Sequence, residues 1–375
     1  MENNYKLEKI ESIFIISIIM ISKLILNIPY YIVNLVGTGA IVNIIYISII
    51  DFIFLLILLK LFKKFENSDI LDISEFLGGK TLKIIVGLIS IALFFLISFI
   101  TLLDFSNVLR TIYFSNFNMI YILLFFIVGT LIANLSGLKS ISHSISFIVP
   151  LIILSIFITF FAVWNNFDIK NLTPILGESY HTTFIKGLSN TFVMNFIIYF
   201  YFIKPLLKNP SDFNKISIIS YIVSFVLLLL TVTSMLTLFS SPSGNEPINS
   251  LLLLARQIEL GDFLQRVDAF FIFLWIFSFF SYFSFVIFII NRIIKKITNV
   301  TNEKMISFST CSILFGLALM PTNVSQIRFI ENVFYRYFVL IFMFGIGLFI
   351  LLFANIKKRR KANKQIWKKQ FYFLL

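Results

Sequence analysis

Residues 82–109 read LKIIVGLISIALFFLISFITLLDFSNVL, and Lys83 and Asp104 are the only charged residues in this stretch. A helix needs roughly 20 apolar residues to cross a hydrocarbon core about 30 Å thick, because lipid leaves every backbone polar group to be paired within the segment. The stretch therefore predicts a membrane-spanning helix. Outward from it, the same pattern predicts ten spans, at 10–33, 39–62, 82–109, 118–138, 143–164, 181–206, 215–241, 264–294, 304–321 and 332–355.

The composition of the whole chain supports an all-α integral membrane protein. Hydrophobic residues make up 59% of the 375 residues and charged residues 13%, with a mean hydropathy of +0.96, which is outside the range of soluble domains. No polar block between the apolar runs is long enough to fold separately. We expect one transmembrane domain over residues 1–356, followed by a basic cytoplasmic tail over residues 357–375.

The net charge of +13 is explained by membrane topology. The basic residues cluster in short loops and in the tail and form no folded basic face, so a nucleic-acid partner is not expected. If the N-terminus is cytoplasmic, most of the 31 Lys and Arg residues fall in the inner segments. This asymmetry predicts that both termini are cytoplasmic and that the lipid bilayer is the main surrounding.

Motifs of catalytic and metal sites are missing from the sequence. It contains two His and one Cys, Cys311, and no GxSxG, HExxH, Walker or GxGxxG pattern. We therefore expect no enzyme activity, no metal and no cofactor.

Three ionisable residues lie at membrane depth, where a charge is costly and usually faces a partner or a cavity. Lys23 lies within the first span. Its ammonium either pairs with a neighbouring helix, extends outward to the membrane interface or lies near a ligand. Asp51, near the middle of the second span, either neutralises Lys23 or takes part in a proton relay. Asp104, near the outer end of the third span, is either solvated or part of the same buried set.

Polar residues interrupt two corresponding spans, the first of each half of the chain. The first span carries Asn27 before Pro29, and the sixth carries Asn195 before Pro205. Proline removes a donor and clashes with the preceding turn, so each break frees backbone groups that transporters use to bind ligands. A plain kink and helix–helix hydrogen bonds are the alternatives. The candidates for ligand contact are Ser22, Lys23, Asn27, Met194 and Asn195.

The eighth span begins with two charges and an aromatic residue. Arg266 and Asp268 are expected to form a salt bridge at the membrane rim, and Trp275 is expected at the interface with the lipid headgroups.

Three passages resemble the spore germination permease family (GerAB type), a branch of the amino acid-polyamine-organocation superfamily. They are NLTPILGES at Asn171–Ser179, QRVDAFFIFLWIFSFF at Gln265–Phe280 and SEFLGGKTLKIIVGL at Ser74–Leu88. Within these passages the motif residues are Pro174, Gly177, Arg266, Asp268 and Trp275.

This resemblance implies a ten-helix fold of two inverted five-helix repeats (APC/LeuT type), with the first and sixth spans unwound around a small ligand. Members of the family sense nutrient germinants, commonly amino acids, in the inner membrane of dormant spores. They act with an A-type membrane subunit and a C-type lipoprotein subunit. The resemblance therefore implies the permease-like subunit of a germinant receptor.

The chain departs from the family pattern at both breaks. Relatives usually carry glycine there, whereas this sequence reads ISKLILNIP in the first span and FVMNFIIYFYFIKP in the sixth. Unwound backbone is easiest at glycine, so Asn27 and Asn195 are expected to support the breaks. Two other functions stay open: a proton-coupled amino acid transporter that uses Asp51 or Lys23, and a scaffold that has lost its ligand site.

Overall fold

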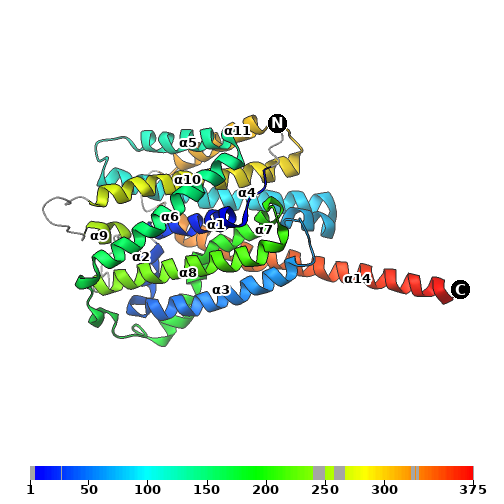
Figure 1. Ribbon diagram of the computed structural model, residues 1–375, viewed down its shortest axis with the longest axis horizontal. Coiled ribbons are helices and arrows are strands. Elements are labelled where there is room, and N and C mark those ends of the chain that lie inside the picture. The colour runs from blue at the N-terminus through cyan, green and yellow to red at the C-terminus, as the bar shows by residue number, and fades with distance from the viewer. Residues whose placement is uncertain are drawn as a thin grey trace.

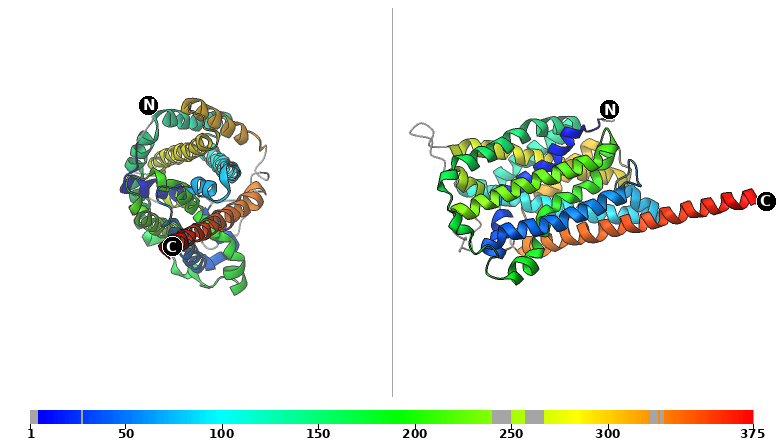
Figure 2. Two further views of the ribbon diagram at one scale, coloured as in Figure 1. Left: turned by 90° about the vertical axis from the view of Figure 1, so that its right-hand side faces the viewer. Right: turned by 60° about the horizontal axis from the view of Figure 1, so that its bottom comes forward.

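The computed structural model describes residues 5–26, 28–239, 250–256, 267–321, 326 and 329–374. Over these residues the chain forms an elongated bundle of helices that run roughly side by side (Figure 1). Both chain termini lie at the same end of the bundle, which we call the terminal end, and the last helix projects beyond it (Figures 1 and 2). This arrangement fits a chain that crosses the bundle an even number of times.

The first half of the chain contains α1 (Lys9–Leu24), α2 (Ile28–Val36), η1 (Gly37–Gly39), α3 (Ala40–Phe62), α4 (Ile70–Ile112), α5 (Met119–Ser136) and α6 (Leu138–Ala162). Short turns η2 (Trp164–Asn166) and η3 (Ile169–Leu172) lead to the sixth span, built from η4 (His181–Ile185), η5 (Lys186–Tyr199), α7 (Phe200–Ile203) and η6 (Lys204–Leu206). Then follow η7 (Pro210–Asp212), α8 (Phe213–Leu238), α9 (Ser250–Arg256), α10 (Val267–Thr298), α11 (Glu303–Ala318), η8 (Ile330–Tyr335), α13 (Arg336–Leu340), η9 (Ile341–Ile346) and α14 (Gly347–Leu374).

Seven helical stretches in the described chain are long and apolar enough to cross a membrane. They are Ile28–Phe62, Ile70–Ile112, Met119–Ser136, Leu138–Ala162, Pro210–Leu238, Phe270–Thr298 and Arg336–Lys361. The multi-pass membrane character is therefore confirmed, but the count of ten spans is not. Helices α1 and α11 have 16 residues each, about 24 Å at 1.5 Å per residue, and the sixth predicted span is wound from short pieces.

Helix α4 is longer than its predicted span because it contains a bend. Its N-cap Asp69 accepts hydrogen bonds from the backbone of Leu71 and Asp72, which starts the helix well before position 82. Gly78 and Gly79 leave helical geometry, and Gly79 has φ +74°, a conformation that favours glycine. The predicted span at 82–109 is the part that follows this bend.

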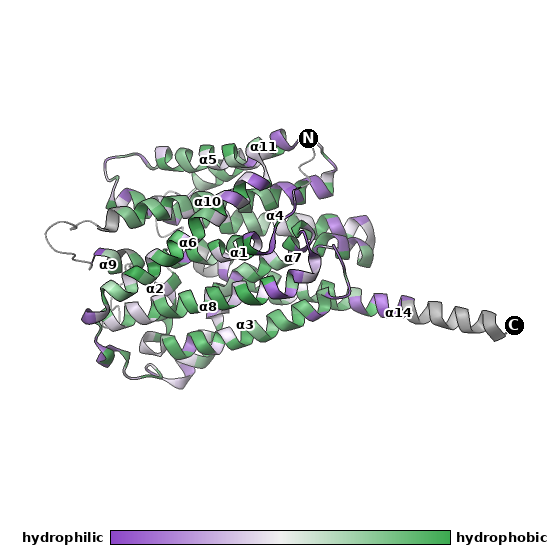
Figure 3. Ribbon diagram, viewed as in Figure 1, coloured by the Kyte–Doolittle hydropathy of each residue, from purple (hydrophilic) through white to green (hydrophobic). Residues whose placement is uncertain are grey.

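The bundle is apolar both inside and along its outer faces. Figure 3 shows hydrophobic residues along the length of the helices and hydrophilic residues mainly at the two ends. On α3, for example, Ile49, Ile53 and Leu56 are exposed, whereas Leu55 and Leu58 are buried. Since lipid tails are as apolar as these side chains, close packing rather than exclusion of water holds such helices together.

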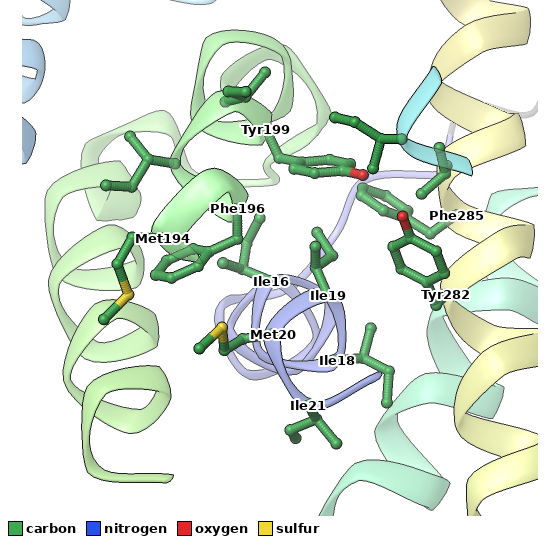
Figure 4. Packing of buried hydrophobic residues seen from close by; sticks show 14 of the residues in the cluster. Ile16, Ile18, Ile19, Met20, Ile21, Met194, Phe196, Tyr199, Tyr282 and Phe285 are labelled. Atoms are coloured by element: carbon green, nitrogen blue, oxygen red, sulfur yellow. The ribbon is translucent and has the colours of Figure 1, made fainter. Parts of the chain in front are cut away.

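Helix α1 lies at the centre of this packing. Figure 4 shows its Ile16, Ile19 and Met20 enclosed between Phe196 and Tyr199 of η5 on one side and α10 on the other. These side chains are almost fully buried. The first span is therefore held by both the sixth and the eighth predicted spans.

The segment before α1 is fastened to the segment after the sixth span. The Leu7 N–H donates to the Leu206 carbonyl at 2.8 Å, and the Lys208 N–H donates to the Leu7 carbonyl at 2.9 Å. The Glu8 carboxylate also pairs with the Lys208 ammonium at 2.8 Å, and this contact lowers the pKa of Glu8. The terminal ends of the first and sixth spans are thereby joined.

The last helix, α14, passes through position 357 without a break and ends at Leu374. The basic tail predicted from the sequence is thus a continuation of the last span. At the first residue of this tail, the Lys357 ammonium donates to the carbonyls of Phe76 and Leu77, next to the bend of α4.

Candidate functional site

The first span is interrupted where the sequence placed the break. Helix α1 ends at Leu24, Ile25 and Leu26 form a turn, and α2 begins at Ile28. Pro29 explains the interruption, because it has no N–H and its ring would clash with the carbonyl of Ile25 in a continuous helix. In the first turn of α2 the same proline is tolerated.

The sixth span is also irregular at its middle. It begins as a π-helix in η4 and continues as a 3₁₀-helix through η5, and Met194 within η5 leaves helical geometry with ψ 28°. Long 3₁₀ runs are uncommon because their hydrogen bonds are poorly aligned. Asn195 directly follows Met194, so the Asn195 side chain lies next to the point where helical geometry is lost.

Lys23 links the two irregular regions. Its ammonium donates to Asn195 Oδ1 at 2.5 Å and to the Tyr335 hydroxyl at 3.4 Å, and Asn195 Nδ2 donates to the same hydroxyl at 2.5 Å. All three side chains are at most 5% exposed. A polar triangle of Lys23, Asn195 and Tyr335 therefore joins the end of α1, the middle of η5 and the end of η8.

A small cavity of about 20 Å³ lies beside this triangle. Its lining consists of Lys23, Leu26, Ile28, Tyr31, Ile100, Thr101, Asp104, Phe192 and Tyr335. A cation and an acidic residue thus line one space, together with two tyrosines and a phenylalanine. The volume has room for about one water molecule, so a larger ligand requires these side chains to move.

The other candidates for ligand contact have different surroundings. The Ser22 hydroxyl is buried and donates to the Ile19 carbonyl of its own helix at 3.2 Å. Met194 is buried at the irregular point of η5. Asn27 lies outside the described residues. Ligand contact by any of these residues stays a prediction.

Asp51 does not pair with Lys23. It lies fully buried on α3, and both carboxylate oxygens lack a hydrogen-bond partner among the residues that the structure describes. The nearby Tyr221 hydroxyl, on α8, instead donates to the Ser48 carbonyl at 2.6 Å. Asp51 does not neutralise Lys23, because Lys23 is bonded to Asn195 and Tyr335 of the predicted sixth and tenth spans, whereas Asp51 lies near Tyr221 on α8.

The family model described as "spore germination protein", a permease model, matches residues 6–327. The chain belongs to the spore germination permease family. It is also similar to Spore germination protein A2 of Bacillus subtilis (strain 168), with 22% identity over 254 residues. That match covers 65% of this chain and 66% of the relative, slightly less than two thirds of the relative's length.

The loop at Asn171–Ser179, which carries Pro174 and Gly177 and which we call the motif loop, packs closely against its neighbours. Thr38 in η1 donates to the Pro174 carbonyl at 2.7 Å. Gly177 has φ +68°, and a Cβ there would lie 2.7 Å from the Val36 carbonyl oxygen. Gly39 is equally tight, because a Cβ would lie 2.6 Å from Thr183 Oγ1. The glycines let the loop contact the corner between α2 and α3.

The start of the sixth span is fastened both to this loop, through Thr183 Oγ1, which donates to the Leu176 carbonyl at 2.7 Å, and to α3. Asn43 on α3 donates to the Thr183 carbonyl at 2.7 Å, and Asn190 Nδ2 donates to Asn43 Oδ1 at 2.9 Å. Pro174 and Gly177 therefore belong to a packing unit at this end of the family's fold, and neither lines the cavity beside Lys23.

The eighth-span motif has one member whose side chain is described. Arg266 lies outside the described residues, and Asp268 lies on the first turn of α10. Trp275 was expected at the membrane interface, but it is 1% exposed and packs inside the bundle. The prediction was wrong because hydropathy along a span does not show which face of the helix meets lipid.

Of the nine residues that line the cavity, the sequence predicted only Lys23 and Asp104. The other seven lie in apolar stretches and are ordinary packing residues by type: Leu26, Ile28, Tyr31, Ile100, Thr101, Phe192 and Tyr335. The one sequence feature that pointed to any of them was the hydroxyl group of Tyr335 near the start of the last predicted span. Tyrosines at such positions are too common in membrane helices to identify a site residue.

Proposed function

We propose that this chain is the permease-like subunit of a spore germinant receptor and binds an amino acid at the cavity between Lys23 and Asp104. The observation that carries the proposal is the pair of residues of opposite charge, Lys23 and Asp104, that line one small cavity. A free amino acid carries a carboxylate and an ammonium, so Lys23 would bind the carboxylate and Asp104 the ammonium. Charge-assisted hydrogen bonds of this kind are stronger than neutral ones.

Binding in this mode would rearrange the polar triangle. The ligand carboxylate would compete with Asn195 and Tyr335 for the Lys23 ammonium, because that ammonium already donates to both side chains. Asn195 and Tyr335 belong to different spans, so a change of partner would alter how these spans are held together. A ligand shifts a conformational equilibrium only through such differential contacts.

The site is too small for an amino acid in the present arrangement, and we take this to be a closed state. The walls next to the cavity belong to the first and sixth spans near the points where regular helical geometry is interrupted. Local opening is easiest at such places. Germinant binding and opening would therefore be one event.

The family relationship supports the remaining parts of the proposal. We place the receptor in the spore inner membrane, with both termini cytoplasmic, and expect it to act with an A-type membrane subunit and a C-type lipoprotein. A permease-like subunit needs no catalytic residues, and we propose no enzymatic step.

The test is a binding screen with the purified full-length chain. Amino acids, sugars and nucleosides are added separately and the unfolding temperature is measured, since a ligand that binds the folded state alone raises it. The proposal expects stabilisation by one or a few amino acids. Stabilisation by sugars or nucleosides alone, or by none of the compounds, would contradict it, and the second outcome would favour the scaffold.

A second function is favoured by one observation, the buried carboxyl group of Asp51, which has no hydrogen-bond partner among the described residues. A proton-coupled amino acid transporter needs a buried group that gains and loses a proton. Purified protein in sealed vesicles distinguishes the two functions. A transporter accumulates the amino acid when a pH gradient is imposed, whereas a receptor subunit binds it without accumulation.

A further inference from the structure

A second, larger cavity lies at the terminal end of the bundle. Its volume is about 540 Å³, within the usual range of small-molecule sites. Residues of the N-terminal segment, α4, the α5–α6 junction, α10 and α11 line it, and none of them lines the cavity beside Lys23. Any ligand of this cavity is therefore separate from the proposed germinant.

The lining has an apolar part and a basic part. Phe288, Leu138, Leu206 and Ile306 form the apolar part. The basic side chains are Lys6, Lys83, Arg292, Lys295 and Lys296, and Glu303 is the acidic one. A ligand that uses both parts must carry an anionic group next to a hydrocarbon group.

Most of the positive charge is already balanced. Lys83 pairs with Glu75 at 2.7 Å, Lys295 with Glu303 at 2.7 Å, and Lys296 with both Asp69 and Asp72 at 2.6 Å. The five basic side chains that line the cavity have four acidic ion-pair partners between them, Glu75, Glu303, Asp69 and Asp72, so one positive charge is unmatched within this set. A ligand with a single negative charge balances the site.

The excess charge lies at Lys6 and Arg292. The Lys6 ammonium donates to the Pro205 carbonyl, and Arg292 comes no closer than 4.0 Å to the Asp69 carboxylate. The Arg292 Nε is buried and has no hydrogen-bond partner within the described part of the chain. Burial and the neighbouring Arg292 guanidinium lower the pKa of Lys6, as expected for two cations that face each other.

We propose that this cavity binds an anionic phospholipid, with its phosphodiester between Lys6 and Arg292 and an acyl chain against Phe288 and Leu138. A phosphodiester carries one negative charge, which equals the excess, and its acyl chain accounts for the apolar lining. Inorganic phosphate carries more negative charge and has no hydrocarbon group to contact the apolar lining. The terminal end of a membrane bundle is also where lipid headgroups lie, and basic pockets between helices bind such headgroups.

The test uses the full-length chain purified in detergent. Phosphatidylglycerol or phosphatidylcholine is added at equal concentration, and retained lipid is counted by native mass spectrometry. We expect one phosphatidylglycerol molecule to be retained in preference to phosphatidylcholine, and inorganic phosphate at millimolar concentration not to displace it. Lys6→Gln and Arg292→Gln should each weaken retention about fivefold, as expected for one charge near a headgroup, whereas Arg292→Lys should largely preserve it.

The matched control is Lys208→Gln, because Lys208 lies nearby on the same segment pair and does not line the cavity. Equal retention of the two lipids, displacement by inorganic phosphate, or equal loss in the Lys208 variant would each overturn the proposal. Should Arg292→Gln fail to fold, Lys6→Gln still decides, since Lys6 precedes the first helix. Amino acid binding measured in parallel separates this outcome from failure of the germinant site.

Discussion

Replacing Lys23 by methionine tests the proposed amino acid site most directly. Methionine has a similar length and no charge, so Lys23→Met removes the donor to Asn195 and Tyr335 with little change in packing. A hydrogen bond to a charged group contributes about 1.5–3 kcal/mol. We therefore expect affinity for the amino acid to fall about 10- to 150-fold.

Stability should change much less than affinity in this variant. The loss leaves Asn195 Oδ1 without its donor, at a cost of about 1–3 kcal/mol. The variant also no longer buries an ammonium, and desolvation of a buried ion costs several kcal/mol. These effects have opposite signs, so a folded Lys23→Met protein is expected.

The assay compares an amino acid with the amine that lacks only its carboxylate. Titration calorimetry on the purified chain measures both ligands against wild type and Lys23→Met. If Lys23 binds the carboxylate, the variant loses affinity for the amino acid and keeps its affinity for the amine. Lys186→Met is the control, because Lys186 is an exposed lysine on η5 of the sixth span, the element that carries Asn195. Unchanged amino acid affinity, or equal losses for both ligands, would refute the reasoning.

Three further predictions concern the same framework. Asn195→Leu should lower the free energy of unfolding by about 2 kcal/mol, because it removes an acceptor from a buried ammonium. In a double-mutant cycle, adding Lys23→Met should recover part of this loss. If the two losses simply add, the result counts against the polar triangle. In thermal unfolding, Gly177→Ala should destabilise the protein by at least about 1–2 kcal/mol, because Gly177 has a positive φ and the added Cβ would meet the Val36 carbonyl oxygen. In the same measurement Gly316→Ala should be neutral or stabilising, because a Cβ at position 316 has open space around it. Asp51→Asn should have a free energy of unfolding within about 1 kcal/mol of wild type or above it, because neither carboxylate oxygen has a partner to lose in the part of the chain that the structure describes. A clear loss in chemical unfolding would show that the carboxylate has an essential contact.

Much of the fold could be predicted from the sequence because lipid imposes a simple length requirement. The runs predicted at 118–138 and 143–164 correspond to α5 at Met119–Ser136 and α6 at Leu138–Ala162. The break in the first span was also predictable, since Pro29 acts through its own ring and its missing N–H. These features depend on a few consecutive residues.

The site could be predicted only in part, because its contacts join distant segments. Lys23 and Asn195 were each recognisable as polar groups in apolar surroundings, and the structure joins them across 172 positions. Their common partner Tyr335 lies 312 positions from Lys23 and has no local signal. Asp51 shows the opposite error, because complementary charges in a sequence do not indicate which helices are neighbours.

The joint between Leu7 and the segment after Pro205 bears on how a signal would cross the membrane. Its two backbone hydrogen bonds alone, at about 1 kcal/mol each, would leave such a joint open roughly 3% of the time, and the Glu8–Lys208 ion pair can only lower this fraction. While the joint is closed, the first and sixth spans are bonded to each other at the terminal end, so a tilt of one span must move the other. A rearrangement near Lys23 would then reach the terminal end as one displacement of both spans, and breaking the joint would let the two spans move independently.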